Sequence, residues 1–156
     1  MPGETPRYPP HCRSLTHHRV RVADTDMMGI VHHARYVGWL EEGRIEYMRR
    51  RGLPYAELVT RGLHLPVVSL SLDYRQSARF DDWLEVETRL ARVTRVRVAF
   101  AYTVRRPGSH GETAGLLAEA AVGLACINGT GRPCRLPGDA EQALLRAEIA
   151  ADTAPR

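Results

Sequence analysis

Alternation of apolar and polar residues dominates the second half of this chain, whereas only one long segment repeats apolar residues at the period of a helix. Apolar side chains at steps of three and four predict an amphipathic helix over residues 34–51. Alternation predicts four strands, over residues 18–23, 68–75, 84–90 and 95–104, and a run of small and apolar residues predicts a fifth, longer strand over 114–127. Because one helix can bury only one face of such a sheet, we expect an antiparallel sheet that wraps the helix and also pairs with another subunit.

Turn residues and composition divide the rest of the chain. A short helix is predicted over residues 54–61, and Asp139 with Gln142 resembles a capping box that begins a helix ending near Ala150. Gly43 in a helix interior costs about 1 kcal/mol, which indicates that a sheet packs closely against it. The class is therefore α+β, with a Pro-rich flexible arm at residues 1–14, one domain at 15–137, and a helix and tail at 138–156.

All 22 basic residues are arginines, and with 18 acidic residues they give a formal net charge of +4. Guanidinium groups bind phosphates well, but aromatic side chains do not interleave with a basic stripe, so we expect no nucleic-acid partner. The three cysteines lack C-x-x-C spacing, which predicts neither a disulfide framework nor a zinc site. The sequence shows no signal peptide and no apolar run of membrane length, so we expect a cytoplasmic protein without a membrane span.

The segment DTDMMGIVHHARY, residues 24–36, concentrates acids and histidines between a strand pattern and the long helix pattern. It places Asp26 near a helix N-terminus, where unpaired backbone N–H groups and the positive end of the helix dipole point outward. A carboxylate beside such donors can attack an activated carbonyl or activate water against it. Asp26 could instead serve as a helix cap or an Asx turn. Asp24 is expected to be structural, closing the turn or pairing with an arginine.

The acids and histidines of this segment also permit a metal hypothesis. The adjacent side chains of His32 and His33 should diverge, however, and no H-x-x-x-H pair is present, so we expect no metal and no cofactor. A G-x-S-x-G nucleophile elbow is absent as well, which argues against a Ser-His-Asp hydrolase.

The motif D-x-D-x-x-G-I-V-x-H-A-x-Y of residues 24–36, preceded by R-V-R-V at 19–22, also resembles the motif of a known protein family. With the helix motif W-L-E-x-x-R-x-E-x-x-R at 39–49 and the string Y-x-x-x-A-x-x-D-D at 74–82, it resembles the hotdog-fold acyl-CoA thioesterases of the 4-hydroxybenzoyl-CoA thioesterase and YbgC type. The resemblance covers about residues 19–137. It implies a five-stranded antiparallel sheet wrapped around one long central helix.

The resemblance also implies roles for particular residues. Asp26 acts on the thioester as nucleophile or general base, and the backbone N–H of His33 polarises the carbonyl, while the His33 side chain is typical of the YbgC branch. Tyr36 is a candidate wall of the acyl pocket or a core residue. Arg95 and Arg97 occupy the stretch that contacts coenzyme A phosphates. Sites of this family form between two subunits, so we expect a homodimer or homotetramer.

We therefore expect an acyl-CoA thioesterase that releases a free acid and coenzyme A. The thiol of coenzyme A has a pKa of about 8.5, so its thiolate leaves without strong general-acid catalysis, and one carboxylate with an oxyanion site suffices. Two alternatives stay open: hydrolysis of an acyl group from acyl carrier protein, which an arginine-rich surface would suit, and a non-catalytic acyl-CoA-binding module. Met27, Met28 and His32 depart from the residues common in the family and flank the acyl channel, so the acyl class stays open.

Overall fold

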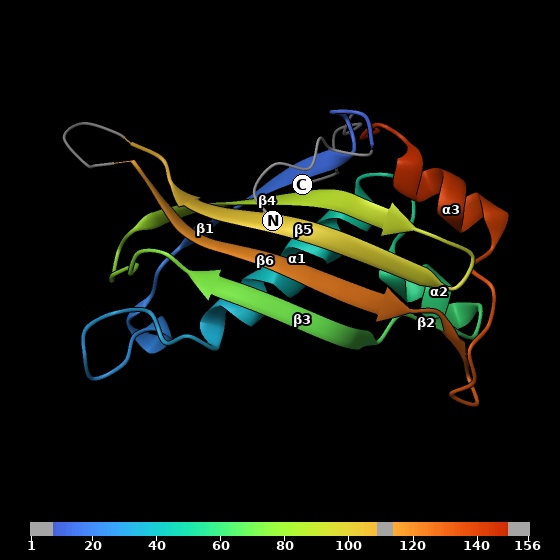
Figure 1. Cartoon of the computed structure of the whole chain (residues 1–156), viewed down its shortest axis with the longest axis horizontal. Coiled ribbons are helices and arrows are strands. Elements are labelled where there is room, and N and C mark those ends of the chain that lie inside the picture. Colours follow the sequence, from blue (N-terminus) through green and yellow to red (C-terminus); the bar gives the residue numbers. More distant parts are fainter. Residues whose placement is uncertain (1–7, 109–113, 150–156) are drawn as a thin grey trace, which may run out of the picture.

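The computed structural model describes residues 8–108 and 114–149 (Figure 1). Within these residues one antiparallel sheet has the strand order β1-β4-β5-β6-β3. Its strands are β1 (Arg13–Arg19), β3 (Val67–Tyr74), β4 (Trp83–Val93), β5 (Arg97–Arg106) and β6 (Gly115–Ala125). The helix α1 (Arg35–Arg49) runs along one face of the sheet. The predicted α+β class and the hotdog arrangement are thus confirmed.

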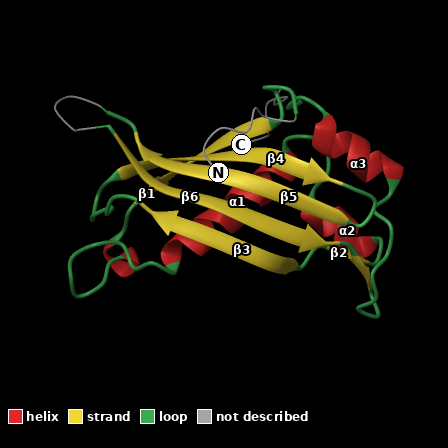
Figure 2. Ribbon diagram, in the orientation of Figure 1, coloured by secondary structure: helices red, strands yellow, loops and turns green. Residues whose placement is uncertain are grey.

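Short elements lie at the two ends of this sheet (Figure 2). One end carries the 3-10 helix η1 (Val22–Asp24) and the loop that leads into α1. The other end carries α2 (Tyr55–Thr60), α3 (Gly138–Leu145) and a small antiparallel pair of β2 (Leu63–His64) with β7 (Ile127–Asn128). The sequence did not predict β2 and β7, because two residues are too few to show alternation.

The core lies between α1 and the inner face of the sheet. Alternation along β4 and β5 buries Leu84 and Val86 on one strand and Phe100 and Val104 on the next. At Gly43 a Cβ atom would lie 2.5 Å from Thr88 Oγ1 on β4. The close approach of the sheet that the mid-helix glycine predicted is therefore confirmed.

The first strand lies earlier in the chain than expected. We expected it over residues 18–23, but β1 ends at Arg19 and Val22 is exposed. The expectation was wrong because β1 turns Ser14 and Thr16, rather than apolar side chains, toward the core. The strand overlaps the last two residues of the expected arm, whose residues 1–7 lie outside the described part of the chain. The division into arm, domain and tail stays a prediction.

The C-terminal helix also differs in detail from the expectation. It begins after Pro137 without a side-chain cap and ends at Leu145. The expected capping box is wrong, because the Asp139 carboxylate accepts hydrogen bonds from the Arg61 guanidinium at 2.8 and 3.0 Å. No helix in residues 8–108 or 114–149 has the length and apolar character needed to cross a membrane.

A buried arginine joins the two ends of the chain to α1. Arg51 is 0% exposed, and its guanidinium lies 3.6 Å from the centre of the Tyr47 ring. All five of its side-chain N–H groups are used, with acceptors on Ser14, His11, Arg13, Tyr47 and Arg146. A buried guanidinium is stable only with such complete pairing, so Arg51 fixes the segments before β1 and after α3.

Candidate active site

Asp24 anchors the loop between β1 and α1. Its buried carboxylate accepts hydrogen bonds from the Arg21 backbone N–H at 2.9 Å and from the Arg21 guanidinium, and it lies 3.7 Å from the Arg35 guanidinium. Burial alone would raise the pKa of Asp24, but its hydrogen bonds to Arg21 and the charges of Arg21 and Arg35 hold that pKa below its ordinary value. These contacts fit the structural role predicted for Asp24.

Asp26 lies in a tight turn two residues further on. Its N–H donates to Ile30 O at 2.9 Å, and the Gly29 N–H donates to Asp26 O at 3.0 Å. Gly29 has a φ of 72°, a left-handed conformation that glycine adopts without strain. Asp26 Oδ1 accepts from the Met28 N–H at 2.8 Å, which is the Asx turn left open by the sequence. Within the described residues Oδ2 accepts no hydrogen bond, so one carboxylate oxygen stays available.

Asp26 and His33 line the same pocket, which has a volume of about 280 Å³. Its other lining residues are Met28, Ile30, Val31, Tyr36, Tyr74, Arg75, Gln76 and Ser77. The Tyr36 ring meets the rings of Trp39 and Tyr74 edge to face, with centroids 5.3 and 5.2 Å away. Burial raises the pKa of Tyr36, which keeps its hydroxyl neutral. The pocket thus combines one carboxylate with an aromatic and aliphatic wall.

The residue two positions before α1 has a backbone N–H group without an acceptor in the described part of the chain. The N–H groups of Ala34 and Arg35 donate to His32, at Nδ1 and at the carbonyl oxygen. The His33 N–H has no acceptor within residues 8–108 and 114–149. The Tyr74 hydroxyl donates to His33 O at 2.8 Å, which fixes this peptide against β3. The His33 N–H is therefore free to donate to another acceptor.

The two histidines do not diverge as expected. The rings of His32 and His33 lie 4.1 Å apart between centroids, tilted by 32°. Contact between neighbouring side chains is possible because both lie exposed before the first turn of α1 rather than within it. In the described ranges, no three His, Cys, Asp or Glu side chains come together as a metal site would require.

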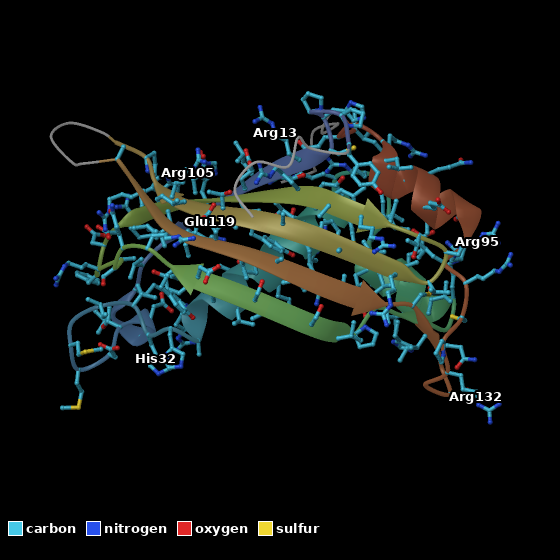
Figure 3. The ribbon with its side chains drawn as sticks, viewed as in Figure 1. Arg13, His32, Arg95, Arg105, Glu119 and Arg132 are labelled. Atoms are coloured by element: carbon cyan, nitrogen blue, oxygen red, sulfur yellow. The ribbon has the colours of Figure 1, made fainter. Side chains whose placement is uncertain are left out.

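Arg95 and Arg97 are not brought to this pocket within one chain. Arg97 begins β5 and Arg106 ends it, and the Arg106 guanidinium donates to the backbone of Ser77, which lines the pocket. The length of β5 therefore separates Arg97 from the pocket by about 30 Å. Figure 3 shows Arg95 and His32 at opposite ends of the molecule.

One segment of the pocket was not predicted from the sequence. Its four residues, Tyr74, Arg75, Gln76 and Ser77, follow one another where β3 ends. The Val31 N–H donates to Ala78 O at 2.8 Å, which joins this segment to the Asp26 loop. The string of residues 74–82 was noted for its resemblance, but only the pairing of distant segments places it beside Asp26.

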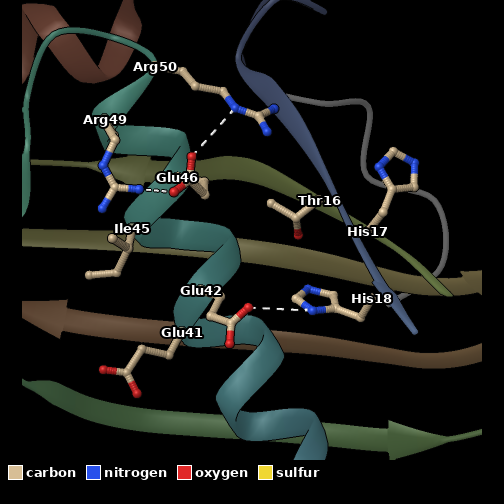
Figure 4. Close-up of a pocket in the computed structure, with 9 residues that line it drawn as sticks. All are labelled: Thr16, His17, His18, Glu41, Glu42, Ile45, Glu46, Arg49 and Arg50. Carbon is tan, nitrogen blue, oxygen red and sulfur yellow. Dashed lines mark ion pairs between the residues drawn. The ribbon is translucent and has the colours of Figure 1, made fainter. Parts of the chain in front are cut away.

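A larger pocket of about 590 Å³ lies between β1 and α1 (Figure 4). Its carboxylates all have partners: His18 Nδ1 lies 3.4 Å from Glu42, Glu46 pairs with Arg49 and Arg50, and Glu41 lies 3.8 Å from Arg44. Because these carboxylates already have cationic or imidazole partners, the smaller pocket with its free Asp26 oxygen is the better candidate for catalysis.

Comparison with known proteins agrees with this fold and site. A family model described as the thioesterase-like superfamily matches residues 20–145. The acyl-CoA thioesterase YbgC of Haemophilus influenzae is 32% identical over 127 residues, which are 80% of this chain and 89% of that protein. The structure of a hypothetical protein from Thermus thermophilus is 42% identical, with a TM-score of 0.77 over 84% of this chain and 96% of the other.

The structure of a 4-hydroxybenzoyl-CoA thioesterase mutant complexed with 4-hydroxybenzoyl-CoA is 25% identical, with a TM-score of 0.77 over 85% of this chain and 98% of the other. Over three further curated bacterial relatives the match spans 67%, 48% and 64% of their lengths. The family model nevertheless covers most of this chain, and the YbgC match covers most of both proteins. This chain is therefore a YbgC-like member of the thioesterase-like superfamily, with the hotdog fold.

Proposed function

We propose that this protein hydrolyses the thioester bond of an acyl-CoA to a free acid and coenzyme A. The observation that carries the proposal is one pocket lined both by Asp26, whose Oδ2 accepts no hydrogen bond within the described residues, and by His33, whose N–H has no acceptor there. The kinship with YbgC-type acyl-CoA thioesterases supports the same activity.

The chemistry follows from these two groups. The Asp26 carboxylate either attacks the thioester carbon, forming a mixed anhydride that water then opens, or takes a proton from the attacking water. The carbonyl oxygen becomes negative in both cases, and the His33 N–H at the positive end of α1 stabilises it. Loss of one such donor typically costs about 2.7–4 kcal/mol. The thiolate of coenzyme A then leaves without a general acid.

The pocket walls suggest how the acyl group is placed. Tyr36 is fixed by its contacts with Trp39 and Tyr74, so it forms a rigid wall. The Tyr74 hydroxyl holds the peptide that carries the His33 donor. The exposed His33 side chain lies at the pocket and is a candidate to orient the carboxylate or the substrate. Tyr36 and His33 therefore act on the substrate beside Asp26.

A second copy of the chain is part of the proposal. The strand β3 is an edge of the sheet, and Val67, Val68 and Leu70 on it are 47%, 49% and 42% exposed. Unpaired edges of this kind join a second strand readily, and pairing two β3 strands around a two-fold axis gives a homodimer. The two-fold axis then brings Arg95 and Arg97 of one copy toward the Asp26 end of the other, where they bind coenzyme A phosphates.

The experiment is a thiol-release assay over a panel of acyl-CoAs, with the wild-type protein, Asp26→Asn and the control Glu57→Gln. Glu57 is an exposed carboxylate on α2, away from both the Asp26 pocket and the β3 edge. We expect hydrolysis of at least one acyl-CoA by the wild type and Glu57→Gln, and hydrolysis at least about 100-fold slower by Asp26→Asn. Hydrolysis of acyl carrier protein esters alone would instead favour the carrier-protein reading. Tight binding without turnover by the wild type would favour a binding module.

The same preparation distinguishes the two roles of Asp26. In a single turnover in oxygen-18 water, a nucleophilic carboxylate whose anhydride is opened by water at the Asp26 carbonyl gives the product acid an unlabelled oxygen and takes up the label itself. A general base gives a labelled product acid and unlabelled Asp26, and so does an anhydride that water opens at the acyl carbon, so an unlabelled product acid is the result that excludes the general base. Labelled Asp26 after turnover would support the nucleophilic route.

A further inference from the structure

Two cysteines face each other across the turn that follows β6. The Sγ atoms of Cys126 and Cys134 are 3.6 Å apart, and the Cys134 N–H donates to the Cys126 carbonyl at 3.0 Å. The residues next to them, Ile127 and Pro133, form an antiparallel bridge, and residues that face each other across such a pair have Cα atoms about 4.5–5.5 Å apart, a separation that a disulfide spans. Both residues are free thiols in this structure. Closing the gap between the sulfur atoms therefore needs a side-chain adjustment and no change of fold.

The two thiols differ in accessibility. Cys126 is 0% exposed, and burial together with the neighbouring Cys134 raises the pKa of its thiol. Cys134 is half-buried, so a small oxidant reaches it before it reaches Cys126. An accessible cysteine with a second thiol beside it is the arrangement in which a sulfenic acid is captured as a disulfide.

We propose that Cys126 and Cys134 form an oxidative modification site, at which hydrogen peroxide converts the two thiols into one intramolecular disulfide. Peroxide oxidises the Cys134 thiol to a sulfenic acid and is itself reduced to water. The Cys126 sulfur then attacks the Cys134 sulfur, the S–S bond forms, and the hydroxyl group leaves with the thiol proton as a second water.

The disulfide closes the short segment that contains β7. The Cys126 N–H donates to Val96 O at 2.9 Å, and the Leu136 N–H donates to Arg95 O at 2.6 Å, so both ends of this segment are fixed to the turn between β4 and β5. This turn lies at the end of the molecule opposite the Asp26 loop (Figure 3). The same turn carries Arg95, the proposed phosphate contact of the other copy, so the modification is best measured by mass rather than by activity.

Peptide mapping tests the proposal without an activity assay. Trypsin does not cut between Arg132 and Pro133, so both cysteines fall in the peptide 106–135, whereas Cys12 falls in the peptide 8–13. Folded wild-type protein is treated with peroxide, denatured and alkylated without reduction. We expect the peptide 106–135 to carry no alkyl group and to be lighter by two hydrogen atoms, while the peptide 8–13 carries one alkyl group. Dithiothreitol should restore two alkylation sites to the longer peptide.

Two variants complete the test. Cys126→Ser removes the resolving thiol, so Cys134 should then be trapped by dimedone as a sulfenic acid. Cys12→Ser should leave the oxidation of the pair unchanged. The proposal is overturned if wild-type protein keeps two alkylated cysteines at a peroxide dose that oxidises Cys134 in Cys126→Ser. It is equally overturned if Cys134 ends as a sulfinic acid or in a disulfide between two chains.

Discussion

A mixture of two damaged variants would show whether two copies of the chain build each site. Asp26→Asn removes the reactive carboxylate, and Arg95→Ala with Arg97→Ala removes the candidate phosphate contacts. Within one chain Arg97 lies about 30 Å along β5 from the end that contacts the Asp26 pocket. A hybrid dimer therefore contains one site with both lesions and one site with neither.

The size of the recovery follows from this geometry. Random exchange makes about half of the dimers hybrids, and one of two sites in each hybrid is intact, so the mixture should regain about a quarter of wild-type activity. The assay is acyl-CoA hydrolysis at a substrate concentration well below the wild-type KM, after the two variants have exchanged subunits. An activity equal to the mean of the separate variants would refute the shared site.

Three further predictions concern stability, each measured by urea unfolding at a fixed protein concentration. Arg51→Lys leaves at least two buried acceptors unpaired and should lower the free energy of unfolding by about 3–5 kcal/mol. The control, Arg49→Lys at an exposed position, should change this free energy by less than about 0.5 kcal/mol. Equal effects of the two substitutions would contradict the structural role of Arg51. Gly43→Ala forces a Cβ against Thr88 and should lower the free energy of unfolding by about 1–3 kcal/mol. Gly38→Ala, on the open side of α1, should raise it by about 1 kcal/mol. An increase at both positions would show that the sheet does not approach Gly43. Burial, together with the charge of His17, lowers the pKa of His18 in the folded protein more than the charges of Glu42 and Asp24 raise it. In acid the unfolded chain therefore binds more protons at His18 than the folded protein does. The contribution of His18 to the free energy of unfolding is complete above its ordinary pKa of about 6.5 and is lost as the pH falls through its pKa in the folded protein. His18→Gln should therefore flatten the decline of this free energy below about pH 7. An unchanged slope would contradict a role of His18 in the decline.

Much of the fold could be predicted because its main elements carry their own periodic signal. The helix α1 and the strands β4 and β5 bury one face each, and their periodicity is visible in the sequence, as is the alternation of β3, which the structure leaves largely exposed. The bounds of β1 were not predicted, because its inward-facing side chains include Ser14 and Thr16, which are polar residues typical of a surface. The role of Arg51 could not be predicted either, since its acceptors come from both ends of the chain.

The candidate site shows the same division between local and distant information. Asp26, His33 and Tyr36 lie within one continuous segment, so their shared pocket could be predicted from spacing and resemblance. Tyr74 and Ser77 join them only through the pairing of that segment with the chain after β3. The distance of Arg95 and Arg97 from the pocket depends on the direction of β5, which no local pattern reveals.

The most direct measurement of the central claim is the single-turnover rate of Asp26→Asn with an acyl-CoA that the wild type hydrolyses, together with its Kd for that ester. We expect the rate to fall by about 100-fold to 10,000-fold, the range for loss of one acid-base group, while the Kd and the unfolding midpoint stay near the wild-type values. A single-turnover rate equal to that of the wild type in the folded variant would contradict the assignment of the reaction to Asp26.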